Sequence, residues 1–449
     1  MPGIKKAIIL GAGPTGLATA LLLANRSNIS VSIYEVRPAP ATIGGAIGIP
    51  SNGTRLLSRL SDDGRIYAAL AEKAPIVPKL VLHSASKGSV LGEADWTMYT
   101  ERETGFGYMR VKRTDLMDVL LDAVRERDID VHFGKKVVSI HDDEEGTPEG
   151  KITVRFDDGT EDTADILIGA DGIHSAVRNL YVDPGVREEY TGIAATFSSV
   201  KTESLPPDLC PKNLAMHSVL TTQGLFAVIP CTPSGNELFW FFSREMPLPA
   251  NAIATATSSA TSESEPESQP GSDSRDGWEM RRRNEVSSFK TILLDTVSEV
   301  QGHWGATIRA IINATDSIQF YPVHRLPSGG RWTRGRCILL GDAAHAMPPH
   351  AGQGVSMALE DAFALSGLLA RETTLEGVWD RYEAVRRPRV EAIAGKSETN
   401  RKVRNKTGPW GLWVKEMGIM VGMWVYWLLG LGSWGFGQGY IVYDIEKEI

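Results

Sequence analysis

The stretch KKAIILGAGPTGLATALLLA, from Lys5 to Ala24, constrains the fold more than any other part of the chain. Two lysines before a long apolar run also describe a secretory signal, but the core of a signal is an uninterrupted apolar segment. Helix-breaking residues interrupt this run at Gly11, Gly13, Pro14 and Gly16. The letters AIIL suit a strand buried in a parallel sheet, and LATALLLAN has helical character. The stretch therefore predicts a strand, a glycine-rich turn and a helix.

A second strand, VSIYE, follows and ends in Glu35, 19 positions after Gly16. Gly-x-Gly-x-x-Gly between a strand and a helix, with an acid closing the next strand, is the dinucleotide-binding fingerprint. In it Gly11 permits the tight turn, Gly13 lets the backbone approach a pyrophosphate, and Gly16 allows close packing of the helix. Glu35 can accept a hydrogen bond from a ribose hydroxyl. The same pattern at 430–435 is rejected, because neither a helix nor a strand-terminal acid follows it.

Composition narrows the class of protein. The chain has 449 residues, a net charge of −8 and 42% hydrophobic residues, which is enough for two domains with cores and gives no sign of nucleic-acid binding. Its three cysteines, Cys210, Cys231 and Cys337, lie far apart with no metal-like spacing. We expect buried thiols, no metal site, and an intracellular, cytoplasmic location, where thiols stay reduced.

Two later stretches distinguish between NAD and FAD, which the fingerprint alone does not. DILIGADGIHSAVR, at 165–178, is a buried strand running into a turn and a polar helix start, and CILLGDAAHAMPPHAGQGVSMALEDAFAL, at 337–365, is a strand, an acid, a Pro/Gly loop and a long helix. With these three motifs in order and spacing, the sequence resembles the class A flavoprotein monooxygenases, the family with the p-hydroxybenzoate hydroxylase fold. It is especially similar to fungal members that resemble salicylate hydroxylases, and the resemblance covers nearly the whole chain.

The resemblance implies bound FAD. The first motif would hold the ADP half, Asp171 would lie near the pyrophosphate and the nicotinamide approach, and Asp342 would bind the ribityl chain. The chemistry agrees, because a carboxylate at the end of a buried strand can accept hydrogen bonds from a polyol. Gly354 and Val355 open a helix, whose free N–H groups and positive dipole end can face the pyrimidine edge of the flavin.

Two further stretches fit the same cofactor. In IGGAIGIPSNGTRLL, the backbone at Gly45 and Gly48 can pass beside FAD, and VKRTDLMDVLLDAV places Arg113 at the start of an amphipathic helix. By resemblance, Arg113 is the arginine that contacts the cofactor. The alternative is a solvated charge, although an arginine in the first turn is not favoured by the helix dipole.

The motifs and the resemblance together predict an α/β fold. It consists of a Rossmann-type FAD-binding domain, an inserted and mostly antiparallel β substrate domain, and a helical C-terminal region. The segment at about 250–277 is rich in Ser, Thr, Glu and Pro and is predicted to be a disordered surface loop of the substrate domain. The expected boundaries are 1–75, 108–180 and 325–372 for the FAD-binding domain, 76–107 and 181–324 for the substrate domain, and 373–449 for the C-terminal region.

The chemistry implied by the family uses NADH or NADPH to reduce FAD, and O2 then forms a C4a-hydroperoxyflavin that transfers one oxygen atom. The leading expectation is hydroxylation of an aromatic or indolic small molecule, in fungal-type secondary metabolism or aromatic catabolism. Epoxidation or Baeyer–Villiger oxidation by the same flavin chemistry is one alternative. A flavin-binding partner protein without oxygenation is another.

No catalytic residue can be assigned from the sequence. His345 and His350 lie in the third motif and are interpreted as residues around the cofactor rather than bases. His217 and Tyr190 lie in the expected substrate sheet, but the alternation of side chains does not show which face they occupy.

The C-terminal stretch from Met417 to Tyr443 carries no formal charge and is rich in tryptophan. It is long enough to span a membrane or to lie at its surface, but glycines fill its second half. Three interpretations remain open: a cover over the active site, a peripheral membrane contact, and a transmembrane helix.

Overall fold

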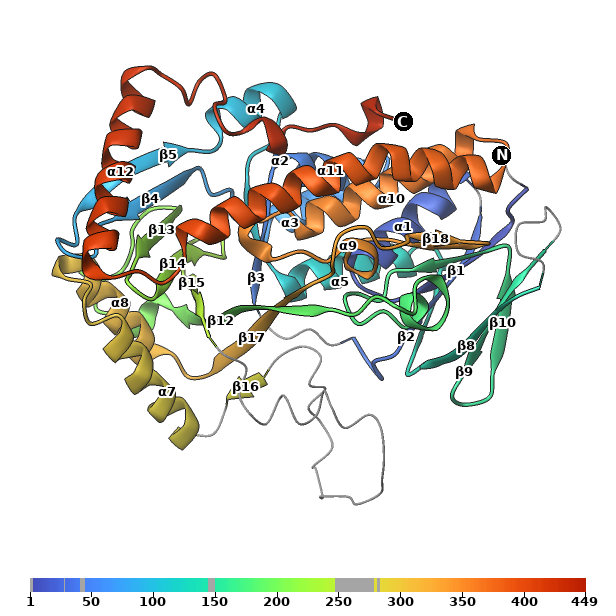
Figure 1. Cartoon of the computed structure of the whole chain (residues 1–449), viewed down its shortest axis with the longest axis horizontal. Helices are drawn as coiled ribbons and strands as arrows, with labels where there is room; N and C mark the ends of the chain where they lie inside the picture. Colours follow the sequence, from blue (N-terminus) through green and yellow to red (C-terminus); the bar gives the residue numbers. More distant parts are fainter. Residues whose placement is uncertain (1–2, 28, 41–44, 144–149, 247–277, 281–282) are drawn as a thin grey trace.

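The computed structural model describes residues 3–27, 29–40, 45–143, 150–246, 278–280 and 283–449. The segment predicted to be a disordered loop, about 250–277, lies outside these residues. The molecule is elongated, with one large sheet in each half and two long helices packed along the first half (Figure 1). The α/β fold class expected from the sequence is confirmed.

The glycine-rich stretch opens a six-stranded sheet. Its order is β18-β19-β11-β1-β2-β7, and all neighbours are parallel except β18 and β19. The strands of this sheet are β1 (Lys6–Leu10), β2 (Ser30–Glu35), β7 (Asp130–Phe133), β11 (Ile166–Gly169), β18 (Thr333–Arg334) and β19 (Cys337–Leu339). The strand, glycine turn and helix predicted for the N-terminus are present, because α1 (Pro14–Ser27) follows β1 directly.

Helices and small sheets complete this half. The helix α1 packs against α5 (Arg113–Arg125) and α10 (Gly354–Arg371), and α10 packs in turn against α2 (Ser51–Ser58) and α11 (Leu375–Val403). Apolar side chains of these helices and of the six-stranded sheet form one buried core. The remaining elements of this half are β3 (Ala46–Ile49), β6 (Met109–Lys112), β8 (Val137–Asp142), β9 (Ile152–Phe156), β10 (Glu161–Ala164), α3 (Arg65–Ala71), α9 (Asp342–His345) and a π-helical turn at Arg178–Val182.

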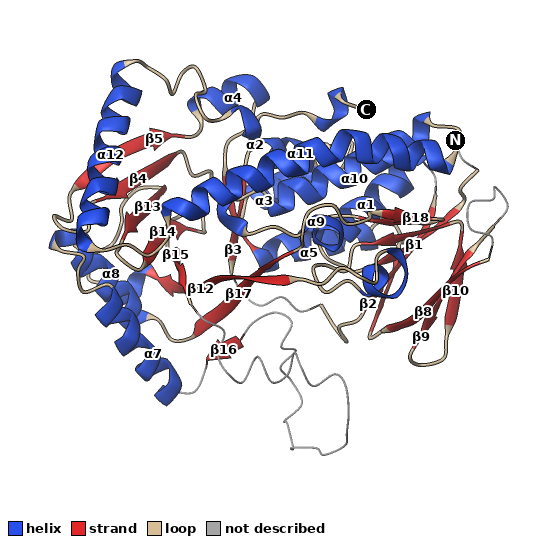
Figure 2. Ribbon diagram, viewed as in Figure 1, coloured by secondary structure: helices blue, strands red, loops and turns tan. Residues whose placement is uncertain are grey.

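The second half is an eight-stranded sheet of order β16-β17-β12-β15-β14-β13-β4-β5. It is antiparallel except between β13 and β4. Two helices, α7 (Arg283–Thr296) and α8 (Gly302–Ala314), lie along one side of this sheet and share a second core with it (Figure 2). The strands are β4 (Lys79–His83), β5 (Val90–Asp95), β12 (Glu189–Lys201), β13 (Ala215–Leu220), β14 (Gly224–Pro230), β15 (Glu237–Glu245), β16 (Trp278–Met280) and β17 (Ile318–Arg325).

The C-terminal segment returns to the second half. The 29-residue helix α11 runs along the molecule, and α12 (Pro409–Leu428) then lies at its far end, beside β4 and β5 (Figure 1). The short helix α4 (Met98–Thr104) lies near the loop that follows α12. None of the helices in the described ranges is long and apolar enough to cross a bilayer.

Candidate active site

The glycine turn has three different local environments. Gly11 has φ +106°, and a Cβ there would lie 2.4 Å from the carbonyl oxygen of Ala170 in the second motif. A Cβ on Gly16 would lie 2.0 Å from the carbonyl oxygen of Gly11, so only glycine lets α1 pack this closely. At Gly13, by contrast, a Cβ would meet no atom within 4 Å. The turn therefore leaves its backbone open to a ligand at Gly13 and closes it on either side.

Glu35 reaches this turn from the end of β2. Its buried carboxylate accepts hydrogen bonds from the Ala12 N–H at 2.9 Å and from the Arg37 N–H at 3.0 Å. A carboxylate has about four acceptor positions, so these two bonds leave capacity for a further donor. Glu35 thus orients the glycine turn and can still accept a ligand hydroxyl.

Asp342 and Arg113 come together although they lie in different motifs. Asp342 follows β19 and Gly341, and its side chain is accessible to solvent although its neighbours Ala343, Ala344 and His345 are buried. Burial raises the pKa of the Asp342 carboxyl, whereas the charges of His345 and Arg113 lower it. The Arg113 side chain is itself exposed, and the Arg113 backbone N–H donates to the Gly45 carbonyl at 2.8 Å. Segments around residues 45, 113 and 342 therefore meet.

The two glycines at 45 and 48 have close neighbours of their own. A Cβ on Gly48 would lie 1.7 Å from the Tyr108 hydroxyl oxygen, and one on Gly45 would lie 3.1 Å from the Phe197 ring. The absent side chain at Gly48 is therefore explained by Tyr108. The predicted approach of FAD to this backbone stays a prediction.

The start of α10 is open on its outer side. Gly352 has φ +63°, and a Cβ at Gly352 or Gly354 would meet no atom within 4 Å. Val355 is half-buried next to it. The first N–H groups of a helix have no partner within the helix, so this end can bind an electron-rich edge of a ligand.

Asp171 mainly holds its own turn. One carboxylate oxygen accepts from the N–H groups of Ala176 at 2.6 Å and Val177 at 3.2 Å, which caps the short helical turn that follows. The other oxygen, Oδ1, is buried without a hydrogen-bond partner among the described residues, and burial raises the pKa of this carboxyl. A buried acceptor without a donor indicates a missing partner group.

Asp361 is a site residue that sequence reasoning missed. From the sequence, an acid this far into a helix is expected to cap the helix or to face solvent. For Asp361 this expectation is wrong. Asp361 is fully buried and accepts from the Gly341 N–H and from His345 Nε2, both at 2.7 Å, and from Arg386 Nε at 2.7 Å. Burial would raise the pKa of its carboxyl, but His345, Arg386 and the Gly341 N–H hold that pKa below its ordinary value.

The neighbouring acid, Glu360, extends this network to the loop before α10. Glu360 accepts from Arg386 at 2.6 Å, from Arg389 at 2.8 Å and from Asn52 Nδ2 at 2.8 Å. Asn52 also donates to Gln353 Oε1 at 2.9 Å. Because all these side chains are buried, the network fixes the relative positions of α2, α10 and α11. No sequence signal pairs residues on α11 with Asp361.

Three aromatic side chains gather on one face of the eight-stranded sheet, where Phe239 is buried and Phe197 and Phe241 are half-buried. We call Phe197, Phe239 and Phe241 the aromatic wall. The rings of Phe197 and Phe239 lie 5.7 Å apart between centroids, and the buried Arg110 guanidinium lies 4.7 Å from the Phe239 ring. Since Gly45 contacts Phe197, the wall stands beside the segment that also meets Arg113. Flat apolar rings suit a planar aromatic ligand.

The candidate bases occupy other environments. His217 faces the opposite side of the sheet, 3.0 Å from His83, whose ring stacks on Trp304 of α8 at 4.3 Å. The Tyr190 hydroxyl donates to the Met246 carbonyl at 2.6 Å. Neither belongs to the aromatic wall.

The histidines of the third motif are engaged within the protein. His345 is held by Asp361, and His350 Nδ1 lies 3.0 Å from Arg404 Nη1. Burial and the charge of Arg404 lower the pKa of His350 to about 3, so this imidazole stays neutral.

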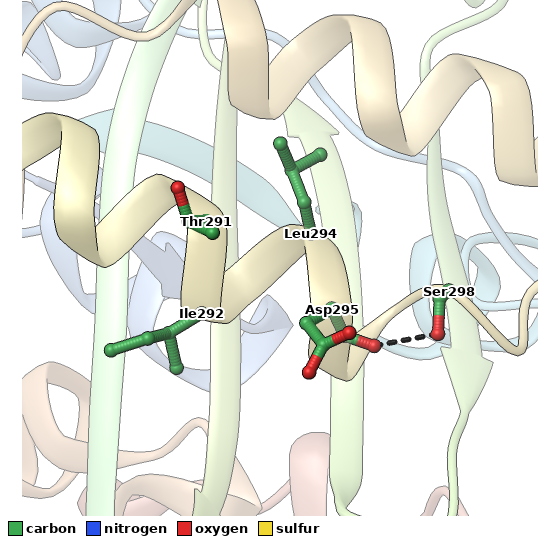
Figure 3. A pocket seen from close by; sticks show the side chains of 5 residues that line it. All are labelled: Thr291, Ile292, Leu294, Asp295 and Ser298. Atoms are coloured by element: carbon green, nitrogen blue, oxygen red, sulfur yellow. Dashed lines mark hydrogen bonds between the residues drawn. The ribbon is translucent and has the colours of Figure 1, made fainter.

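A shallow surface depression on α7 is unrelated to this site. Thr291, Ile292, Leu294, Asp295 and Ser298 line it, and the Ser298 hydroxyl donates to the Asp295 carbonyl at 2.6 Å (Figure 3). The depression lies on a helix of the second half and brings no group of titratable side chains together.

Comparisons with known proteins identify the family of this chain. A family model described as FAD binding domain matches residues 5–267 and 318–397. The chain is 27% identical to 6-hydroxynicotinate 3-monooxygenase of Pseudomonas fluorescens, over 89% of this chain and 92% of that protein. It is 28% identical to a salicylate hydroxylase of Pseudomonas putida, over 85% and 82%, and 26% identical to hispidin-3-hydroxylase of Neonothopanus nambi, over 89% of both.

Solved structures show the same fold. Klebsiella pneumoniae HpxO complexed with FAD and uric acid has a TM-score of 0.73 at 22% identity, covering 94% of this chain and 96% of that one. A salicylate hydroxylase substrate complex has a TM-score of 0.69 at 20% identity, covering 100% and 98%.

Proposed function

The chain belongs to the FAD-binding-domain family and is an FAD-dependent monooxygenase, and we propose that it hydroxylates an aromatic or indolic small molecule with NADH or NADPH and O2. The aromatic wall beside the cofactor motifs is the observation that most supports this substrate class. The named relatives that act on hydroxylated aromatic rings agree with it.

The residues at the site fit FAD. Asp171 Oδ1 is a buried acceptor without a described partner, and the backbone is open at Gly13 and Gly354. We assign the ADP half to the turn at 11–16 with Glu35, the sugar and phosphate groups to Asp342 and Arg113, and the flavin edge to Gly354 with Val355. Asp171, Gly45 and Gly48 complete the assigned cofactor-binding residues. FAD itself supplies the redox and oxygen chemistry.

The protein contributes orientation and a dry environment. The aromatic wall can stack on a planar substrate, and its apolar surface excludes water from the reacting centre. His345 and His350 are bound to Asp361 and Arg404 and are not assigned as bases. The network of Asp361, Glu360 and Arg386 positions the turn that carries Asp342. Positioning accounts for a large share of enzymatic rate enhancement.

The test begins with the purified protein. We expect a flavin spectrum, release of FAD rather than FMN, and NAD(P)H oxidation that a hydroxylated aromatic compound stimulates with equal O2 uptake. A product heavier by one oxygen atom, with the hydroxyl located by NMR, would complete the identification. An epoxide product would instead indicate epoxidation, and a ring-expanded ester would indicate Baeyer–Villiger oxidation. Recovery of FMN alone would contradict the cofactor assignment.

Two phenylalanines of the eight-stranded sheet give a matched control. Phe197→Leu removes a half-buried ring from the aromatic wall, whereas Phe226→Leu changes the opposite face, where Phe226 packs in the second core. We expect Phe197→Leu to raise KM for the aromatic substrate by roughly tenfold, the effect of losing one aromatic contact. Phe226→Leu should lower stability and leave KM unchanged.

We also propose the domain division and location expected from the sequence. The two separate cores support an FAD-binding domain at 1–75, 108–180 and 325–372 and a substrate domain at 76–107 and 181–324. All three cysteines are free, which supports a location in the cytoplasm, because thiols stay reduced there. A peripheral contact of the 373–449 region with a membrane is part of the same proposal.

A further inference from the structure

Large apolar side chains form one exposed face of α12. Residues three, four or seven positions apart share one side of a helix, and these side chains follow that pattern. Trp410 is 80% exposed and Trp424 is 63% exposed. We call this face the outward stripe, and its members are Trp410, Trp413, Val414, Met420, Val421, Trp424 and Leu428. Trp427 lies at the edge of this face, where its indole N–H donates to the Glu93 carbonyl at 2.9 Å.

The opposite face of α12 is firmly attached. Leu412 is buried in the second core, and the buried Glu416 carboxylate accepts from Ser84 Oγ at 2.9 Å and from the Ala85 N–H at 2.6 Å. Met423 packs on Gly92 of β5, where a Cβ would lie 2.7 Å from it. The orientation of the outward stripe is therefore fixed by contacts on the inner face. Figure 1 shows α12 at one end of the molecule, beside β4 and β5.

The stripe is larger than an ordinary scatter of surface apolar residues. It continues after the helix through Leu429, Trp434 and Phe436, of which Trp434 is 81% exposed. Monomeric soluble proteins rarely expose a contiguous apolar patch of this kind unless it binds a partner. The helix has 20 residues, or roughly 30 Å of length at 1.5 Å per residue.

Charge around the stripe identifies the kind of partner. The segment 401–428 holds five basic residues and one acid, Glu416, although the whole chain has a net charge of −8. Of these basic residues, Arg401 pairs with Glu398 and Arg404 lies against His350. Glu416 is buried, whereas Lys402 and Lys406 are exposed just before the helix. Tryptophan is the side chain that favours the level of lipid headgroups, where its ring is apolar and its N–H can be solvated. Basic residues beside such a face are attracted to anionic lipids.

We propose that the outward stripe lies in the headgroup region of an anionic lipid bilayer, with α12 parallel to the membrane plane. This inference rests on the peripheral contact proposed above and not on the oxygenation reaction. It specifies the contacting side chains, the orientation of the helix and the charge of the lipid. The inner face would keep its contacts with β5 and the Ser84 loop, so the enzyme would bind without refolding.

The experiment uses the full-length protein loaded with FAD. Flotation is measured with phosphatidylcholine vesicles and with vesicles that also contain phosphatidylserine, and a brominated phosphatidylcholine reports contact by quenching tryptophan fluorescence. Trp413→Ser/Trp424→Ser tests the stripe, and Lys402→Glu/Lys406→Glu tests its charge. Val138→Ser/Ile292→Ser is the matched control, because these apolar residues are similarly exposed on other elements.

We expect binding to the anionic vesicles with quenching, and a loss of roughly tenfold or more in the tryptophan variant, since two large apolar side chains no longer transfer from water. The lysine variant should lose its preference for anionic lipid, and the control should bind as the unchanged protein does. Equal binding by the tryptophan variant would overturn the proposal. So would a dimer without vesicle binding that Trp413→Ser/Trp424→Ser converts to a monomer, which would make the stripe an interface between copies. FAD content and NAD(P)H oxidation without vesicles separate these outcomes from a failure of the proposed function.

Discussion

At the residue scale, Gly13 and Gly16 lie three positions apart, yet a methyl group would have different effects at the two. Gly16→Ala places Cβ 2.0 Å from a backbone oxygen that cannot move independently, whereas Gly13→Ala meets no protein atom within 4 Å. We expect Gly16→Ala to destabilise the FAD-free protein by roughly 1–3 kcal/mol, as overpacking does. Gly13→Ala should keep its melting temperature and bind FAD more weakly, since its methyl group occupies the ligand side. Equal melting temperatures for the two FAD-free variants would contradict this prediction.

The same residues show what a local pattern contains. The turn at Gly11 and the close packing at Gly16 were predictable because both depend on residues within one strand, turn and helix. Gly48 was not, because its neighbour Tyr108 is distant in sequence. Asp361 was missed for the same reason: its partners lie at the end of β19 and on α11, and an acid inside a helical pattern reads as a surface residue.

At the element scale, the turn that carries Asp342 is held by α10 and α11. Asp361→Asn removes one of the two buried carboxylates that pair with Arg386, and Glu360 remains as the other, so we expect a cost of up to about 3 kcal/mol, at the lower end of that for breaking a buried ion pair. We therefore expect Asp361→Asn to lower the melting temperature of the FAD-free protein and, through the turn, its affinity for FAD. Asp342→Asn should weaken FAD binding with little change in that melting temperature, because Asp342 is solvent-accessible. Thermal unfolding and FAD titration of both FAD-free variants distinguish the cases, and unchanged stability of Asp361→Asn would refute the assigned role.

The elements themselves were predictable to different degrees. The N-terminal strands and helix and the antiparallel strands of the second half follow from continuous or alternating apolar runs. The orientation of α12 does not follow from such a pattern, because the helix is apolar on both sides. The contacts of Glu416 and Met423 show which side faces inward. The bond from Gly341 to Asp361 joins a turn to the next helix and has no periodic signature.

At the scale of the whole molecule, two separate cores share one chain that crosses between them several times. The segment with β4 and β5 leaves the first half early and pairs with β13, and the long strands β12 and β17 connect the halves again (Figure 1). Such crossings are not visible in any local pattern, and the sequence indicated them only through its resemblance to a family. Buried titratable groups lie in both halves, so a fall in pH acts on both.

Three buried histidines make the molecule sensitive to acid. Burial, with the charge of a neighbour, lowers the pKa of His83 to about 4 and that of His350 to about 3, and burial lowers the pKa of His217 to about 4. In the unfolded chain a histidine has an ordinary pKa of about 6.5, so the unfolded state binds protons first as the pH falls. These histidines therefore do not reduce the free energy of unfolding above pH 6.5, and they reduce it progressively as the pH falls from about 6.5 toward 4. At pH 5 each group would cost roughly 2 kcal/mol, before most carboxylates titrate. We expect His83→Gln/His217→Gln to reduce the slope of unfolding free energy against pH between 6.5 and 5, measured by urea titration, while His141→Gln, at an exposed histidine, leaves it unchanged. A slope that survives the double substitution would mean that other groups carry the acid sensitivity.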